Sequence, residues 1–261
     1  MISFTVGTWT DVGIKKKVNQ DAIFFESART PAGPVAMAAI CDGMGGLASG
    51  EKASAVMTSA LGDWFENTLA AFLAKEGTVL TLEAFQEQLD FLVKQADASI
   101  REAVRSASGT TLAAVFLGPG QYFTVNVGDS RVYHIGEGIE QLTKDQTLVQ
   151  QELDAGLITE ADIKTHPGRS VLLQCIGASE FIFPAYTSGT FESGDIFLLC
   201  SDGFRHMITQ GEILESLQTP QAVTESGIAE VLKNLTELCK RRGEKDNISA
   251  LAVRITDGAR L

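Results

Sequence analysis

Cysteine is scarce in this sequence, and its four cysteines lie far apart. Cys41, Cys175, Cys200 and Cys239 form no CxxC pair, so we expect neither a disulfide scaffold nor a cysteine-ligated zinc site. Long hydrophobic runs are also missing: stretches such as residues 35–41 are much shorter than the ~20 residues of a membrane-spanning helix. The opening MISFTVGTW lacks the basic and apolar regions of a signal peptide. These absences predict a reduced, cytoplasmic protein with no membrane partner.

Positive charge is in short supply as well. The chain has 21 lysines and arginines against 33 aspartates and glutamates, which gives a formal net charge of −12. Such a protein repels polyanions unless its charges are segregated, so we expect no nucleic-acid partner. The composition, 44% hydrophobic and 21% charged, is that of a folded globular domain. No repeat, low-complexity tract or long linker divides the chain, and we expect a single domain over residues 1–261, acting as a monomer.

Hydrophobic periodicity predicts strands and helices that come in blocks. Residues 35–41 are continuously apolar, as in a strand buried on both faces, whereas residues 82–104 carry an apolar stripe with helical spacing after a Thr81 N-cap. Strands are expected at residues 2–9, 22–25, 35–41, 112–117, 122–127, 131–135, 171–175, 181–191, 196–200 and 248–255, and helices at 50–74, 82–104, 146–165, 210–217 and 221–242. This block order predicts an α+β fold with antiparallel sheets rather than a parallel βαβ sheet.

Aspartates stand where several apolar strands begin or end. Asp42 and Asp202 each follow a buried strand, Asp246 and Asp21 each precede one, and Asp129 lies in a turn between two. Converging carboxylates at the rim of an apolar core repel one another and are poorly solvated, and hard divalent cations remove both costs. An alternative is that Asp-Gly pairs are simply good turn residues. The glycine-rich run after the first of them favours close approach of the backbone to an ion or a phosphate.

Seven short motifs in one order resemble the metal-dependent Ser/Thr protein phosphatases of type 2C, the PPM family, in their compact bacterial form. The resemblance extends from about residue 7 to 253. The motifs are Val18-Asn19-Gln20-Asp21, Cys41-Asp42-Gly43-Met44-Gly45-Gly46, Ser49-Gly50-Glu51-Lys52-Ala53-Ser54, Gly109-Thr110-Thr111, Val127-Gly128-Asp129-Ser130-Arg131, Ser201-Asp202-Gly203 and Asp246-Asn247-Ile248. The family fold is a central sandwich of two antiparallel β-sheets flanked by pairs of antiparallel helices, and we expect it here.

The resemblance also implies a metal site. By analogy with the family, Asp42 bridges two Mn²⁺ or Mg²⁺ ions and the Gly43 carbonyl binds one of them. Asp202 and Asp246 complete the ligands of the other ion, and Asp21 acts through metal-bound water. This set of oxygen ligands suits hard cations.

Further residues are expected at the site by the same resemblance, with some departures. Asp129, together with the aspartate of the Ser-Asp-Gly motif, corresponds to the pair that holds a third, weaker metal ion. Lys16 stands where the family usually has a phosphate-binding arginine, Met44 where some relatives have a histidine that can act as general acid, and His206 where some have a further acidic ligand. Lysine lacks the planar, two-pronged contact of arginine, so we expect weaker or less oriented phosphate binding, or help from a neighbouring lysine, Lys15 or Lys17. Residues 146–169 match the flap of bacterial relatives.

The function implied is hydrolysis of phosphoserine and phosphothreonine in proteins, by attack of a water that bridges two metal ions. The substrates would include a bacterial Ser/Thr kinase or its targets. No cysteine has an arginine six positions further on, so a cysteine-nucleophile phosphatase is excluded. One alternative is a catalytically weak, metal-binding relative that acts as a regulatory phosphoprotein-binding module. A two-metal nuclease is a third reading, disfavoured by the net charge of −12.

Overall fold

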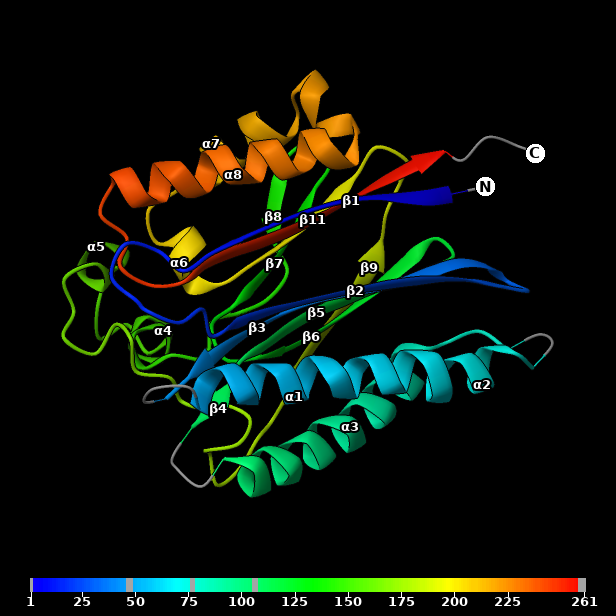
Figure 1. Ribbon diagram of the computed structural model, residues 1–261, viewed down its shortest axis with the longest axis horizontal. Coiled ribbons are helices and arrows are strands. Elements are labelled where there is room, and N and C mark those ends of the chain that lie inside the picture. Colours follow the sequence, from blue (N-terminus) through cyan, green and yellow to red (C-terminus); the bar gives the residue numbers. More distant parts are fainter. Residues whose placement is uncertain (1, 46–48, 76–77, 105–107, 258–261) are drawn as a thin grey trace.

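Two antiparallel β-sheets lie face to face, and helices cover the outer face of each (Figure 1). The computed structural model describes residues 2–45, 49–75, 78–104 and 108–257. Sheet A has the order β1 (Ile2–Asp11), β11 (Ile248–Asp257), β10 (Ile196–Cys200), β7 (Arg131–Ile135) and β8 (Ile139–Gln141). Sheet B has the order β2 (Asp21–Thr30), β3 (Gly33–Met44), β5 (Leu112–Gly118), β6 (Gln121–Val127) and β9 (Ala185–Thr190), with β4 (Gly109–Thr110) paired to the end of β3.

The helices form two outer layers and a small group at one end of the sandwich (Figure 1). Sheet B is covered by α1 (Ser49–Asp63), the π-helical turn η1 (Trp64–Leu69), α2 (Ala70–Leu73) and α3 (Leu82–Ala103). Sheet A is covered by α6 (Asp202–Arg205), α7 (Gln210–Leu217), the 3₁₀ turn η2 (Pro220–Val223) and α8 (Glu225–Arg241). The short helices α4 (Leu148–Asp154) and α5 (Glu160–Ile163) lie within residues 146–169, the segment expected to form the flap.

The central position of β3 in the sandwich explains why residues 35–41 are all apolar. Met37 and Ala39 point into the layer between sheet B and its helices, whereas Ala38 and Ile40 point into the layer between the two sheets. Successive side chains of a strand face opposite sides, so a strand in the middle of four layers has no solvent-exposed face. The side chains of β11 alternate in the same way: one set packs between the two sheets, and the other packs in the layer between sheet A and α8.

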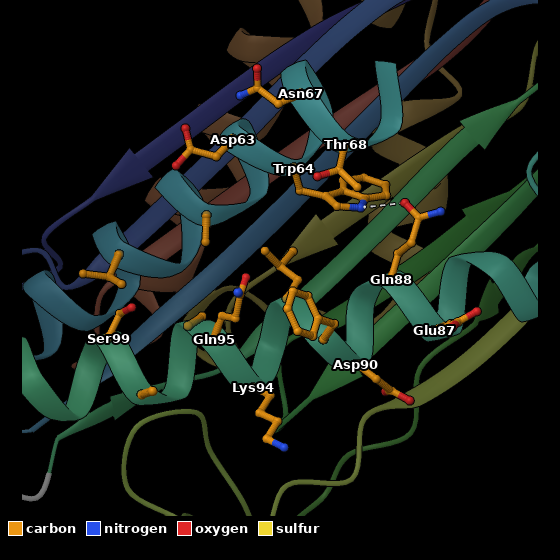
Figure 2. A pocket seen from close by; sticks show the side chains of 16 residues that line it. Asp63, Trp64, Asn67, Thr68, Glu87, Gln88, Asp90, Lys94, Gln95 and Ser99 are labelled. Carbon is orange, nitrogen blue, oxygen red and sulfur yellow. Dashed lines mark hydrogen bonds between the residues drawn. The ribbon is translucent and has the colours of Figure 1, made fainter. Parts of the chain in front are cut away.

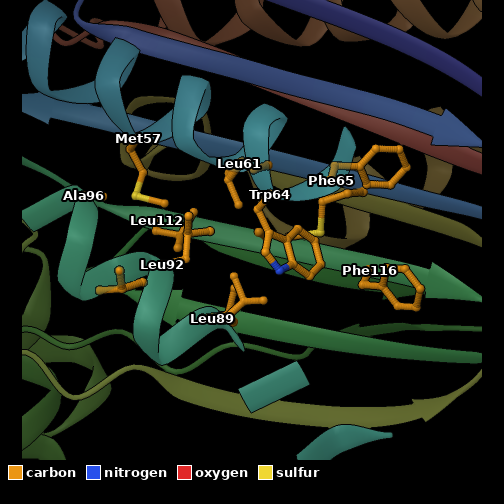
Figure 3. Close-up of a cluster of buried hydrophobic side chains, with 14 of the residues drawn as sticks. Met57, Leu61, Trp64, Phe65, Leu89, Leu92, Ala96, Leu112 and Phe116 are labelled. Carbon is orange, nitrogen blue, oxygen red and sulfur yellow. The ribbon is translucent and has the colours of Figure 1, made fainter. Parts of the chain in front are cut away.

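The helix layer on sheet B is held by side chains that meet between α1 and α3. Figure 3 shows Met57 and Leu61 of α1 directed toward Leu89 and Leu92 of α3, over the strands of sheet B. The Thr81 side chain accepts a hydrogen bond from a backbone N–H in the first turn of α3, which confirms the predicted N-cap. Helix α3 therefore uses its apolar stripe as expected.

The expected sandwich of antiparallel sheets with flanking helices is confirmed, and four element predictions are wrong in whole or in part. Residues 171–175 form no strand, because this stretch makes only an isolated bridge between Leu172 and Thr147, and Val171 and Leu173 are half exposed. The strand expected at 181–191 is confined to β9, and the helix expected at 146–165 is two short helices. The helix expected at 221–242 begins at Glu225, after η2. No helix within the described residues is long and apolar enough to span a bilayer.

Candidate metal centre

Asp21 and Asp42 are brought together by the pairing of β2 with β3. Asp21 is the first residue of β2, and the antiparallel register places it directly opposite Asp42. The Asp42 N–H donates to the Thr111 hydroxyl at 2.9 Å, and the Asp42 carbonyl accepts from the Thr111 N–H at 2.9 Å. The backbone of Asp42 is therefore fixed from both sides, and its carboxylate projects at the end of sheet B.

Asp202 and Asp246 are brought together by the neighbouring strands of sheet A. Asp202 begins α6 directly after β10, and Asp246 lies two residues before β11, the partner of β10. The two turns are in direct contact, because a Cβ atom on Gly203 would collide with the carbonyl oxygen of Asn247. The same Cβ would lie 3.4 Å from the Cβ of Asp246. Glycine is thus required at position 203 for the two aspartates to approach each other.

A serine hydroxyl joins the two sheets at this end. The Ser201 hydroxyl, from the end of β10, donates to Asp21 Oδ2 at 2.9 Å. The same oxygen accepts the backbone N–H of Ser249, from β11, at 3.1 Å. The strand ends of sheet A and sheet B therefore border one site, as the sequence predicts for the four aspartates.

The Gly43 carbonyl, predicted as a metal ligand, lies in tightly packed backbone. The Gly43 N–H donates to the Gln20 carbonyl at 3.1 Å, and a Cβ atom on Gly43 would collide with the carbonyl oxygens of Gln20 and Gly50. Only glycine fits at this position, between the backbone of Gln20 and the first turn of α1. Met44 follows with a half-exposed side chain, and Gly46, the last glycine of the run, lies outside the described residues.

Lys16 reaches the same site from the turn before β2. Its ammonium Nζ lies 2.5 Å from Asp246 Oδ1, with both side chains about two-fifths exposed. Partial burial opposes the charge of Lys16, but the hydrogen bond to Asp246 and the negative charges of Asp42 and Asp202 outweigh it and raise the pKa of Lys16. The structure therefore brings this predicted residue to the aspartates.

The electrostatics of the site are those of carboxylates without a sufficient counter-charge. Burial raises the pKa of Asp21 to about 6, and the nearby charge of Asp246 adds to the shift. Burial and the charges of Asp21, Asp202, Asp129 and Asp246 raise the pKa of Asp42 well above its usual range. Burial also raises the pKa of Asp202. Desolvation and like charges both disfavour ionised carboxylates, and a divalent cation would relieve both.

Two buried carboxylate oxygens are in position to accept a cation. Asp21 Oδ1 and Asp202 Oδ1 are buried and have no hydrogen-bond partner among the described residues. In the described part of the chain, no three or more His, Cys, Asp or Glu side chains form a complete metal-binding group by themselves. A site built on a backbone carbonyl, bridging carboxylates and water needs fewer side-chain ligands, and Mg²⁺ and Mn²⁺ accept such a mixture. The residues present therefore fit hard divalent cations.

Comparisons with known proteins agree with this geometry. The model of the family described as Protein phosphatase 2C matches residues 14–251. The chain belongs to this family. It is 31% identical over 254 residues to "Serine/threonine protein phosphatase PstP" of Mycobacterium tuberculosis, covering 95% of this chain and 44% of that protein. It is 30% identical to "Serine/threonine phosphatase stp" of Listeria innocua, covering 94% and 93%.

A solved structure extends the comparison from sequence to fold. The catalytic domain of PstP, whose crystal structure is described as a complex with two manganese ions, superposes with a TM-score of 0.77 at 29% identity, covering 98% of this chain and all of that one. The chain spans less than half the length of full-length PstP, but nearly all of the Listeria protein. The protein phosphatase 2C fold and family are thus established for this chain.

Asp129, the last predicted ligand, has a cationic neighbour that the sequence reasoning missed. Arg205 Nη2 lies 3.0 Å from Asp129 Oδ2, on the side of the site next to α6. Burial and the charge of Asp202 raise the pKa of Asp129 to about 7, against the opposing effect of Arg205. No motif of the family singled out this arginine, because its role comes from a contact between residues far apart in the sequence.

Two more missed residues hold the Asp246 turn in this phosphatase 2C site. Glu244 is buried, and its Oε1 accepts the backbone N–H groups of Lys245 and Asp246 at 2.7 and 2.9 Å. The Asn247 amide accepts from the Gln20 N–H at 3.0 Å and donates to two carbonyls of the preceding loop. Asn247 stood in a recognised motif, but its part in joining the Lys16 loop to the Asp246 turn could be seen only in the structure.

A large groove on the described surface lies elsewhere. It has a volume of about 1130 Å³ and runs along η1 and α3, between residues such as Asp63, Trp64 and Lys94 (Figure 2). None of the strand-end aspartates lines it, and the Trp64 indole N–H is already bound by Gln88 at 3.0 Å. The site of this phosphatase 2C domain is therefore identified by its buried charges rather than by the size of its cavity.

Proposed function

We propose that this chain is a metal-dependent protein serine/threonine phosphatase that uses two Mn²⁺ or Mg²⁺ ions. The observation that carries the proposal is the convergence of Asp21, Asp42, Asp202 and Asp246 from the two sheets. Family membership and the relatives named as Ser/Thr phosphatases support it. The proposed substrates are phosphorylated proteins, including a Ser/Thr kinase. The monomeric state and cytoplasmic location stay predictions.

The residues have distinct proposed roles around the ions. Asp42 would bridge them, with the Gly43 carbonyl on one, Asp202 and Asp246 on the other, and Asp21 acting through a water ligand. When bound, two such ions supply Lewis-acid activation of water and neutralise charge on the phosphoryl group. The Ser201 hydroxyl holds one oxygen of Asp21, which leaves Oδ1 free to accept a proton from water.

Lys16 is the proposed phosphate-binding cation. It already lies at the mouth of the site, paired with Asp246 and about two-fifths exposed. Divalent ions on Asp246 would compete with Lys16 for this carboxylate, so the ammonium would be released toward an incoming phosphate. The ammonium is a point charge on a flexible stem, which gives attraction without fixed orientation. Lys16→Arg is therefore expected to lower the KM for a phosphopeptide.

The test compares hydrolysis of a phosphothreonine peptide and of p-nitrophenyl phosphate in Mn²⁺ and in EDTA. Wild-type protein is expected to be active only with the metal. Asp202→Asn should lose more than the roughly 10–100-fold typical of changes around a metal's ligands. Asp63→Asn is the matched control, because Asp63 is exposed at the end of α1 and should leave activity unchanged. Tight Mn²⁺ binding without turnover would instead support the regulatory binding module.

A further inference from the structure

A positively charged side chain is built into the acidic site. Arg205 Nη2 lies 3.0 Å from Asp129 Oδ2, 3.3 Å from the Asp129 carbonyl oxygen and 3.2 Å from Asp145 Oδ2. All three side chains are nearly buried, with about a tenth of each exposed. One guanidinium thus contacts both the aspartate that was expected to hold a third metal ion and the residue just before the flap.

The surroundings of Arg205 hold it in this position. The Arg131 guanidinium binds both carboxylate oxygens of Asp145 at 2.7 Å, so Asp145 is a fixed partner rather than a mobile one. Phe204, the preceding residue of α6, is fully buried under α8. Gln146, the first flap residue, exchanges hydrogen bonds with Gly128 and so fixes the turn that carries Asp129. The arginine and its two acidic partners therefore form a rigid unit.

The residue after Arg205 is also not the acidic side chain that some relatives have at this position. His206 stands where some relatives carry an acidic ligand, and its imidazole lies 3.5 Å from Glu244 Oε2 and 3.9 Å from Asp202 Oδ2. It therefore interacts with carboxylates instead of adding one. Of the side chains expected around a third ion, Asp129 already has a cationic partner and the position of His206 contributes no negative charge.

We propose that the Arg205 guanidinium takes the place of a third metal ion at Asp129, so that this phosphatase site holds two divalent ions and no third. The inference rests on the two-ion function proposed above. The Asp129 oxygen nearest α6 is occupied by a charged donor, and a divalent cation there would lie against the guanidinium and be repelled by it. The fixed positive charge also ties Asp129 to the base of the flap, which an exchangeable ion would do only when bound.

The experiment counts Mn²⁺ ions bound per chain by calorimetric titration and by the EPR signal of free Mn²⁺. Wild type is expected to bind two ions, and Arg205→Gln to bind three. Arg205→Lys keeps the charge and should stay at two. Arg242→Gln is the matched control: it removes an exposed arginine that pairs with Glu212 away from the site, and it should also stay at two. Thermal unfolding confirms that each variant is folded.

Several outcomes would overturn the assignment. A third ion bound by the wild type would do so, as would a folded Arg205→Gln that remains at two. If Arg205→Gln does not fold, His206→Asp provides the second test: with Arg205 still present, the added carboxylate should not create a third site, and a third ion there would refute the proposal. A wild type that binds no pair of ions and hydrolyses no phosphopeptide would refute the proposed phosphatase function instead, so the two failures are distinguishable.

Discussion

Removing one buried charge should stabilise the metal-free protein while it weakens metal binding. Asp21 has a pKa of about 6 in the fold, against an ordinary value of 3.8, chiefly because of burial. At 1.36 kcal/mol per pKa unit, the ionised carboxylate costs the folded state about 3 kcal/mol at pH 7. Asp21→Asn removes that charge and keeps an oxygen that can accept the Ser201 hydrogen bond. We expect the variant to gain about 2–3 kcal/mol in EDTA, or ~4–12 °C in Tm.

The pH dependence of this effect has a definite sign. The pKa of Asp21 is higher in the folded than in the unfolded chain, so proton uptake stabilises the fold. The metal-free wild type should therefore lose stability as the pH rises from about 4 to about 6, and Asp21→Asn should lose less over the same range. Urea unfolding in EDTA at several pH values measures both curves. Asp63→Asn, which removes an exposed charge at the end of α1, is the control and should follow the wild type.

Adding Mn²⁺ should reverse the order of the two proteins. Each ion bound only by the folded state contributes about 2.7 kcal/mol at a concentration 100 times its dissociation constant. The wild type gains this stabilisation, and Asp21→Asn gains less because a site residue has lost its charge. If Asp21→Asn were no more stable than the wild type in EDTA at pH 7, the repulsion inferred for the aspartates would be wrong.

Two further predictions concern the fold around the site. The ion pair with Arg242 and the capping hydrogen bonds at Thr209 lower the pKa of Glu212 to about 2. The ionised Glu212 carboxylate therefore stabilises the fold above pH ~4.5, and this stabilisation is lost as the pH falls toward 2. Between pH 6 and 3 the Tm should fall less steeply for Glu212→Gln than for the wild type, and equal slopes would contradict this. Asn247 is buried, and its side-chain oxygen accepts a hydrogen bond from the Gln20 N–H. Asn247→Ala should therefore lower the free energy of unfolding, measured in urea, by ~2–3 kcal/mol and weaken Mn²⁺ binding. A loss below ~1 kcal/mol would show that the hydrogen bonds of this amide matter little.

Local patterns in the sequence were sufficient for most of the strands and for the acidic residues at their ends. The run at residues 35–41 is apolar because β3 is buried on both faces, and a pattern of that kind is visible without coordinates. The stretch at 171–175 misled the same reasoning, because Val171 and Leu173 are apolar yet remain half exposed. Periodicity reports local preference, and it does not report whether a partner strand is available.

The sequence by itself determined which residues are suited to bind hard cations and which family they belong to, since both depend on residue type and order along the chain. Only the tertiary structure decided that Ser201 joins the two sheets at Asp21, that Lys16 pairs with Asp246, and that Arg205 lies on Asp129. These contacts connect residues 76 to 230 positions apart, and their existence depends on how two sheets and a short helix pack. No local spacing carries that information, because the contacts form only when the layers are assembled.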